Sequence, residues 1–247
     1  MKRHQFLSEL HRLVQPRSYL ETGIQKGLSL ALSRVPSVGI DPEFAIDHEL
    51  ATDVHLVRCG SDEFFARPEP LAHLPEPVVD LAFIDGMHLA EYALRDFLAV
   101  ERYTTASSVI LVDDVLPRDV EMTARVRIGL QRWTGDVYKV TRALRTLRPD
   151  LVVIEVGTTG TGTLLVLCPD AARDGVLDGY DEWLEEAIVP DPQDVPESVL
   201  RRTTAVDPVA LVASPAWSTL VEVRGRPHSE AAPVIRAAFA ELAGSGA

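Results

Sequence analysis

Two apolar segments of this 247-residue sequence end in acidic side chains. The first leads to Asp85 and, three residues later, His88; the second leads to Asp113 and Asp114. If the two segments form neighbouring parallel strands, these side chains meet at the carboxyl edge of one sheet, where such folds bind ligands. Clustered carboxylates repel one another unless a cation neutralises them, and oxygen ligands suit a hard divalent ion such as Mg²⁺. The alternative is that Asp113 or Asp114 only caps a helix entered at Pro117.

A glycine-containing turn follows an earlier strand pattern. Glu21 ends that strand, Gly23 turns the chain, and a helix is expected to open near Gly27. Glycines let a ligand approach the backbone closely, and a helix N-terminus offers free N–H groups to an anion. The spacing differs from the dinucleotide fingerprint G-x-G-x-x-G and from the phosphate-binding G-x-x-x-x-G-K-[ST]. A simple packing role for the two glycines is the competing explanation.

A third acidic position, Asp41, ends the next apolar segment about 20 residues further on. In doubly wound nucleotide-binding folds, a carboxylate at this place hydrogen-bonds the ribose hydroxyls. The alternative is an aspartate that caps a turn or a helix.

The elements that must position these residues follow an alternating pattern. After an amphipathic helix ended by Pro16, short apolar segments alternate with longer amphipathic ones, which is typical of βαβ units and a parallel sheet covered on both faces. The loop 157–162 is too short for a crossover helix, so the last two strands are predicted to pair antiparallel. We therefore predict a doubly wound, Rossmann-like α/β fold with seven strands, at 18–22, 38–41, 54–59, 78–85, 109–113, 151–156 and 163–168.

The remainder of the chain has a different pattern. Residues 170–247 contain short helical patterns broken by prolines, the clearest of them entered through Pro233. We predict a domain at 1–170 that carries the site and a helical extension at 171–247 that packs on the core, covers a cleft or pairs subunits.

Composition limits the classes of function. The 24 Lys and Arg residues face 37 Asp and Glu residues, giving a formal net charge of −13. Such an acidic chain repels phosphate backbones, so nucleic acid is not expected as a partner. No apolar run approaches the roughly 20 residues of a membrane span, and the two cysteines fit a reducing cytoplasm. We expect a cytoplasmic protein with a small-molecule partner.

The motifs in this order resemble class I S-adenosylmethionine-dependent methyltransferases. More narrowly, residues 15–170 resemble the metal-dependent small-molecule O-methyltransferases of the macrolide-sugar and cephamycin type. The resemblance implies S-adenosylmethionine as cofactor. Its binding residues are then Glu21, Gly23, Gly27 and Ser29 around the methionine end, Asp41 at the ribose, Ser61 and Asp62 at the adenine, and Asp85.

The resemblance also implies the catalytic groups. Asp85, Asp113 and Asp114 would hold Mg²⁺ or another divalent cation, and His88 can act as the base. Where the family often has Glu-Asp, this chain has Asp113 and Asp114. The expected reaction is methyl transfer to an oxygen of a small molecule.

Two other classes of function remain open on the sequence. One is an NAD-dependent oxidoreductase, which the missing third glycine of the fingerprint disfavours. The other is a non-catalytic binding protein that retains the methyltransferase fold. The sequence does not decide whether the protein is a homo-oligomer.

Overall fold

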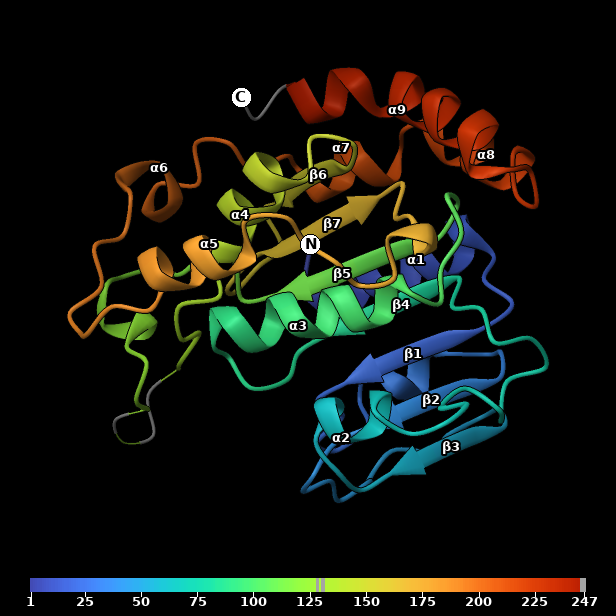
Figure 1. The fold of residues 1–247 in the computed structure, drawn as a ribbon, viewed down its shortest axis with the longest axis horizontal. Helices are drawn as coiled ribbons and strands as arrows, with labels where there is room; N and C mark the ends of the chain where they lie inside the picture. Colours follow the sequence, from blue (N-terminus) through green and yellow to red (C-terminus); the bar gives the residue numbers. More distant parts are fainter. Residues whose placement is uncertain (128, 130–131, 245–247) are drawn as a thin grey trace.

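The computed structural model describes residues 1–127, 129 and 132–244. Seven strands form one sheet at its centre (Figure 1). The strands are β1 (Tyr19–Thr22), β2 (Ser37–Ile40), β3 (Val54–Val57), β4 (Leu81–Ile84), β5 (Val109–Asp113), β6 (Val152–Val156) and β7 (Thr163–Leu167). Six of them lie within the segments predicted from the sequence, and β2 begins one residue before its predicted segment.

The strand order is β3-β2-β1-β4-β5-β7-β6. The first five strands run parallel, whereas β7 runs antiparallel to both β5 and β6. The predicted doubly wound sheet with an antiparallel last pair is therefore confirmed. Because β4 and β5 are direct neighbours, with Ile84 opposite Val112, the residues that follow them emerge side by side at the carboxyl edge.

Alternating strand residues fill two apolar layers, one on each face of the sheet. Leu20, Ala82 and Ile110 share one layer with α2 (Ser61–Phe65), α3 (Ala90–Glu101) and α4 (Lys139–Leu147). Tyr19 and Leu81 share the other layer with helices from both ends of the chain. Those helices are α1 (Arg3–Val14), α7 (Pro208–Val212), α8 (Ala216–Glu222) and α9 (His228–Gly244). In Figure 1, α3 lies in front of the sheet and α1 behind it.

The helix predicted to open near Gly27 does not form, and this expectation was wrong. Only a 3-10 turn, η1 (Leu30–Leu32), follows the glycine turn. The cause is the backbone, because Gly23, Gln25 and Gly27 have φ of 82°, 44° and 81°. Left-handed residues at this spacing interrupt a right-handed helix.

The helix expected after Pro117 is also reduced to a 3-10 turn, η2 (Glu121–Thr123). Asp119 accepts a hydrogen bond from the N–H of Met122, at 2.9 Å, and so supports a local turn. Neither Asp113 nor Asp114 caps a helix here, which removes the alternative explanation of that pair.

The C-terminal segment is helical, as predicted, and also includes α5 (Tyr180–Ala187) and α6 (Glu197–Leu200). The helix predicted to enter at Pro233 begins earlier, at His228, so that proline lies inside α9. Trp217, Leu220 and Phe239 are buried in the layer that also holds α1. The extension thus packs on the core; its boundary at residue 171 stays a prediction, and residues 245–247 lie outside the described residues.

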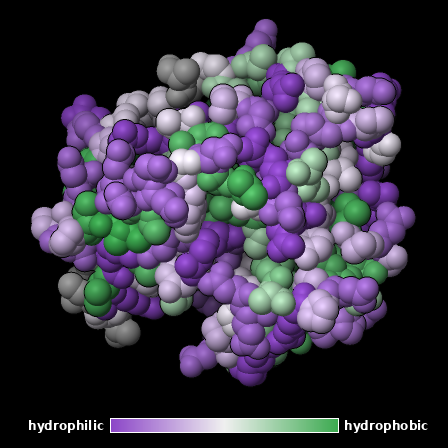
Figure 2. All heavy atoms as spheres, in the orientation of Figure 1, coloured by the Kyte–Doolittle hydropathy of each residue, from purple (hydrophilic) through white to green (hydrophobic). Residues whose placement is uncertain are grey.

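The face of the molecule drawn in Figure 2 is predominantly polar. Figure 2 shows polar side chains over most of the face seen in Figure 1, with apolar ones in small separate groups. Within the described residues, no helix combines the length and the apolar character needed to cross a membrane.

Candidate active site

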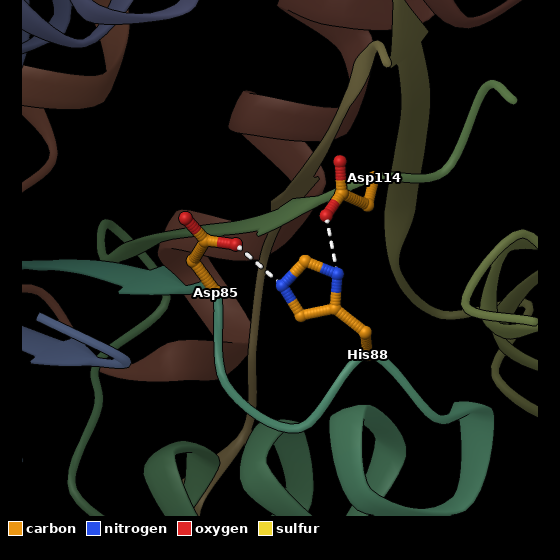
Figure 3. Close-up of side chains that lie close together, drawn as sticks. All are labelled: Asp85, His88 and Asp114. Carbon is orange, nitrogen blue, oxygen red and sulfur yellow. Dashed lines mark ion pairs between the residues drawn. The ribbon is translucent and has the colours of Figure 1, made fainter. Parts of the chain in front are cut away.

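Three of the chemically interesting side chains meet beyond the ends of β4 and β5. The imidazole of His88 lies between two carboxylates, with Nδ1 at 2.9 Å from Asp114 and Nε2 at 3.5 Å from Asp85 (Figure 3). One potential ligand atom of each residue lies within 4.8 Å of the others, so the three could hold a metal ion. The sheet order places Asp85 and Asp114, and the loop before α3 supplies His88.

The backbone at this position is unusual. His88 and Asp114 have φ of 56° and 65°, a left-handed conformation that costs most residues about 1 kcal/mol or more. A second loop packs closely on the first, because a Cβ added to Gly135 would lie 1.6 Å from the carbonyl oxygen of His88. From this loop, Trp133 stacks on the His88 ring, with centroids 5.2 Å apart and planes 6° apart. The imidazole is therefore held from two sides.

The two carboxylates control the charge of His88. Burial lowers the pKa of the imidazole, but hydrogen bonds to Asp114 and Asp85 outweigh that effect and raise the pKa to about 10. The ring is an imidazolium near neutral pH in this arrangement. It can serve as a base only after the carboxylates have been engaged by another cation.

Asp113 has different partners from this trio. One of its oxygens accepts a hydrogen bond from Thr163, at 3.1 Å, and the other is paired with the guanidinium of Arg3. Arg3 Nη1 also lies 3.0 Å from Asp85. Burial raises the pKa of Asp113, and the neighbouring Asp114 and Asp85 raise it further, while Arg3 lowers it. The predicted set of three aspartates is thus divided, with Asp85 shared between its two halves.

Sequence reasoning missed Arg3 in this cluster. Its position near the chain start, on a helix about 80 residues before Asp85, gives no spacing signal. The only available indication is charge balance, since clustered carboxylates require a cation and an arginine can supply it as well as a metal ion.

Gly23 sits where its lack of a side chain is required. A Cβ there would lie 1.9 Å from the carbonyl oxygen of Asp85, so the turn after β1 packs directly on the loop after β4. At Gly27, a Cβ would lie 2.9 Å from the side chain of Ile46. The two glycines bring three loops together at the carboxyl edge.

Glu21 is completely buried and already has polar partners. Its carboxylate accepts hydrogen bonds from Tyr19, at 2.7 Å, and from Ser29. Burial raises the pKa of Glu21 to about 8, although both hydroxyl groups favour the charged form and lower it. The structure therefore connects Glu21 with Ser29, as the predicted site requires, through a direct contact.

Asp41 lies beyond the end of β2 and organises the neighbouring loops. Its two carboxylate oxygens accept the backbone N–H groups of Gln25, at 2.8 Å, and Glu43, at 2.6 Å. Each oxygen keeps a further lone pair, because a carboxylate oxygen accepts two hydrogen bonds. This leaves Asp41 able to accept hydroxyl groups of a ligand.

Ser61 and Asp62 begin α2, after β3. Ser61 hydrogen-bonds the buried Asp96, whose pKa burial raises to about 6. Asp96 also accepts the hydroxyl of Thr22 at 3.0 Å. The exposed Asp62 pairs with Arg95 at 2.7 Å. These contacts link the loop after β3 to the end of β1 through α3.

The carboxylate cluster is tightly packed. The hollow lined by Asp85, His88, Asp113 and Asp114 has a volume of about 10 Å³, which is at most the space of one water molecule. The hollow is therefore too small for an acceptor molecule, although the side chains of His88 and Asp85 remain 18% and 12% exposed.

Comparison with known proteins identifies the core. Residues 20–115 match the sequence model of a family described as "Methyltransferase domain". This part of the chain, less than half of its length, therefore resembles a methyltransferase domain. This match covers Glu21, Asp41, Asp85 and Asp114, whereas Arg3 lies before it. The resemblance to methyltransferases seen in the sequence is thereby confirmed.

Several solved structures are similar to this domain. An O-methyltransferase from Bacillus cereus, solved with S-adenosylhomocysteine, has 16% identity and a TM-score of 0.49, over 67% of this chain and 80% of its own. TomG from Streptomyces achromogenes, an O-methyltransferase of tomaymycin synthesis solved with S-adenosylmethionine, has 21% identity and a TM-score of 0.48, over 67% and 78%. A Podospora anserina methyltransferase bound to S-adenosylhomocysteine has 17% identity and a TM-score of 0.49, over 68% and 78%. The comparison with curated proteins gave no match.

Proposed function

We propose that this methyltransferase domain binds S-adenosylmethionine at the carboxyl edge of β1, β2 and β4 and transfers its methyl group to an oxygen of a small molecule. The observation that carries the proposal is the convergence of the three loops. Gly23 packs on the carbonyl of Asp85, and Asp41 holds the loop that contains Gln25. Acidic groups at this edge complement the positive sulfonium of the cofactor.

The residues have distinct roles in cofactor binding. Asp41 would accept the ribose hydroxyls through its remaining lone pairs, and the turn at Gly23 would admit the methionine end. Glu21 lies before this turn and Ser29 after it, and the hydrogen bond that Ser29 donates to Glu21 holds the two ends of the turn together. Ser61 and Asp62 would border the adenine, where the loop after β3 begins α2.

Methyl transfer from a sulfonium is an in-line displacement. The enzyme's main task is to align the acceptor oxygen, the methyl carbon and the leaving sulfur. A hydroxyl group is a poor nucleophile near neutral pH, so the acceptor also needs help to lose its proton. Asp85 follows β4 and contacts both parts of the site. Its backbone touches the turn at Gly23, and its side chain belongs to the carboxylate cluster around His88.

A divalent cation is the second part of the proposal. Asp85, His88 and Asp114 fit such an ion, since their ligand atoms lie within 4.8 Å of one another. When bound, the ion would favour the alkoxide form of an acceptor hydroxyl. This set combines two carboxylates with one imidazole, so it suits Mn²⁺ or Fe²⁺ as well as Mg²⁺. His88 would serve as a ligand if the ion takes all three residues, and as the base if the ion engages only the carboxylates of Asp85 and Asp114.

Calorimetry with S-adenosylhomocysteine tests the cofactor site. We expect the wild-type protein to bind this product with micromolar affinity and Asp41→Ala to bind at least about tenfold more weakly, a loss of about 1.4 kcal/mol. The control is Asp53→Ala, because Asp53 is exposed and precedes β3 at the opposite edge of the sheet. No heat with the wild-type protein at high micromolar ligand would contradict the proposal, provided that thermal unfolding shows the protein to be folded.

A further inference from the structure

Arg3 is delivered to the carboxylate cluster by a firmly anchored segment. The carbonyl of Met1 accepts a hydrogen bond from the N–H of Thr159 at 2.8 Å, and Gln5 caps the start of α1 through the N–H of Lys2 at 3.0 Å. One turn later, Phe6 and Leu7 are almost completely buried. The guanidinium therefore occupies its position because the helix is fixed on the core.

The contacts of Arg3 are those of a counter-ion. Its Nη1 group donates to both Asp113 and Asp85, and the guanidinium lies 5.7 Å from the centre of the Phe83 ring. The Asp113 side chain is only 1% exposed. A carboxylate buried to this degree is strongly destabilising unless it is paired. Arg3 supplies that pairing together with Thr163.

Two cations of this chain now face three carboxylates. His88 lies between Asp85 and Asp114, and Arg3 lies between Asp85 and Asp113. Arg3 thus occupies the side of the cluster between Asp85 and Asp113. A positive charge so close also repels an ion that approaches the His88 side.

We propose that Arg3 is the resident counter-ion of Asp113 and Asp85, and that it sets the cation affinity of the cluster by occupying the place between these carboxylates. It is a positioning residue, because it acts through the carboxylates. This inference deepens the cation part of the proposed function and rests on it for its biological meaning. The contact itself belongs to the N-terminal helix, outside the matched domain.

Isothermal titration calorimetry with Mn²⁺ tests the role of Arg3. We expect Arg3→Gln to bind Mn²⁺ at least about tenfold more tightly than the wild-type protein, because a buried positive charge is removed from two carboxylates. Arg3→Lys, which keeps the charge, should bind like the wild type. The matched control is Arg12→Gln on the same helix, since Arg12 is exposed and pairs only with Glu9 among the described residues.

A second background keeps the test valid if Arg3→Gln does not fold. Asp113→Asn removes the buried charge that Arg3 pairs, so the double variant R3Q/D113N has no unpaired carboxylate at this place. We expect R3Q/D113N to bind Mn²⁺ at least about threefold more tightly than D113N alone, because repulsion from Arg3 is lost. Mn²⁺ should also raise the thermal midpoint of R3Q more than that of the wild type.

Two results would overturn the inference: equal Mn²⁺ affinity in R3Q and the wild type, or equal affinity in R3Q/D113N and D113N. S-adenosylhomocysteine affinity, measured on the same samples, separates the two proposals. If the wild-type protein does not bind S-adenosylhomocysteine, the proposed function is wrong. If the replacement of Arg3 leaves the Mn²⁺ affinity unchanged, only the role of Arg3 is wrong.

Discussion

The ring of His88 lies parallel to that of Trp133, with a centroid distance of 5.2 Å and an angle of 6° between the planes. The same histidine approaches the backbone carbonyl of Trp133 through Nδ1, at 3.1 Å. The loop that carries Trp133 thereby fixes an imidazole supplied by a different segment of the chain, 45 residues earlier. Packing between the two loops therefore fixes the position of the His88 ring.

Replacement of Trp133 by alanine should loosen His88 and lower stability. The indole also donates a hydrogen bond to the carbonyl of Ala124, at 2.5 Å, so both contacts are lost. We expect a loss of roughly 2 kcal/mol, because aromatic truncation at a half-buried site costs less than the 3–5 kcal/mol of a full core position. Urea unfolding measures this loss. The comparison is Trp183→Ala on α5, where we expect a smaller effect; a larger effect there would contradict the role assigned to Trp133.

Gly135→Ala should be far more damaging than a glycine replacement of the same backbone type elsewhere. A Cβ at Gly135 would lie 1.6 Å from the carbonyl of His88, whereas at Gly225, with φ of 83°, it would meet nothing within 4 Å. Gly225→Ala should cost only the left-handed penalty of about 1–2 kcal/mol. Gly135→Ala should cost more than about 3 kcal/mol. Equal losses in thermal unfolding would show that the two loops are not in close contact.

The charge of Glu21 predicts how stability depends on pH. Burial raises the pKa of this carboxyl from the usual 4.5 to about 8, so the folded protein binds more protons than the unfolded chain between these values. Stability should therefore fall as pH rises through this window, by at most about 1.4 kcal/mol per pH unit from this group.

Glu21→Gln removes that dependence, because glutamine stays neutral. Urea unfolding between pH 5 and 8 should show a shallower decline for Glu21→Gln than for the wild-type protein. Glu9→Gln on the surface serves as the control, with its slope expected to match that of the wild type. Parallel slopes for all three proteins would mean that Glu21 is already charged at neutral pH in the folded state.

The sequence predicted the sheet well, for identifiable physical reasons. Strands β5 and β7 are buried on both faces and consist mainly of apolar residues, as strands covered by two layers must. The loop between β6 and β7 is too short for a crossover helix, so these two strands could pair only antiparallel. The helix expected near Gly27 failed because amphipathic spacing does not reveal left-handed backbone at Gly23, Gln25 and Gly27. Local pattern was informative for buried strands and misleading for a strained turn.

The candidate site was predicted in part. The order of the strands brings Asp85, His88 and Asp114 together, as expected from acids at the ends of adjacent strands. Which neighbour each carboxylate contacts could not be read from the sequence. Asp113 is engaged by Thr163 and Arg3, whereas Asp114 contacts His88. The contribution of Arg3 depends on how a terminal helix docks, which no local spacing encodes.

The two adjacent aspartates, Asp113 and Asp114, should contribute differently to cation binding. Asp114→Asn should weaken Mn²⁺ binding at least about tenfold, since Asp114 belongs to the trio around His88. Asp113→Asn should change Mn²⁺ affinity little, because Arg3 and Thr163 already engage Asp113. Calorimetry of the two variants gives the answer. Equal losses would restore the set of three aspartates expected from the resemblance.

The proposed cofactor site is tested most directly by a crystal structure of the protein in complex with S-adenosylhomocysteine. We predict that the ribose hydroxyls lie within hydrogen-bond distance of Asp41 and that the homocysteine end lies at the turn of Gly23, with its sulfur directed towards Asp85. A ligand bound at another surface, or an edge that stays closed at saturating ligand, would contradict the assignment of this domain as a working methyltransferase.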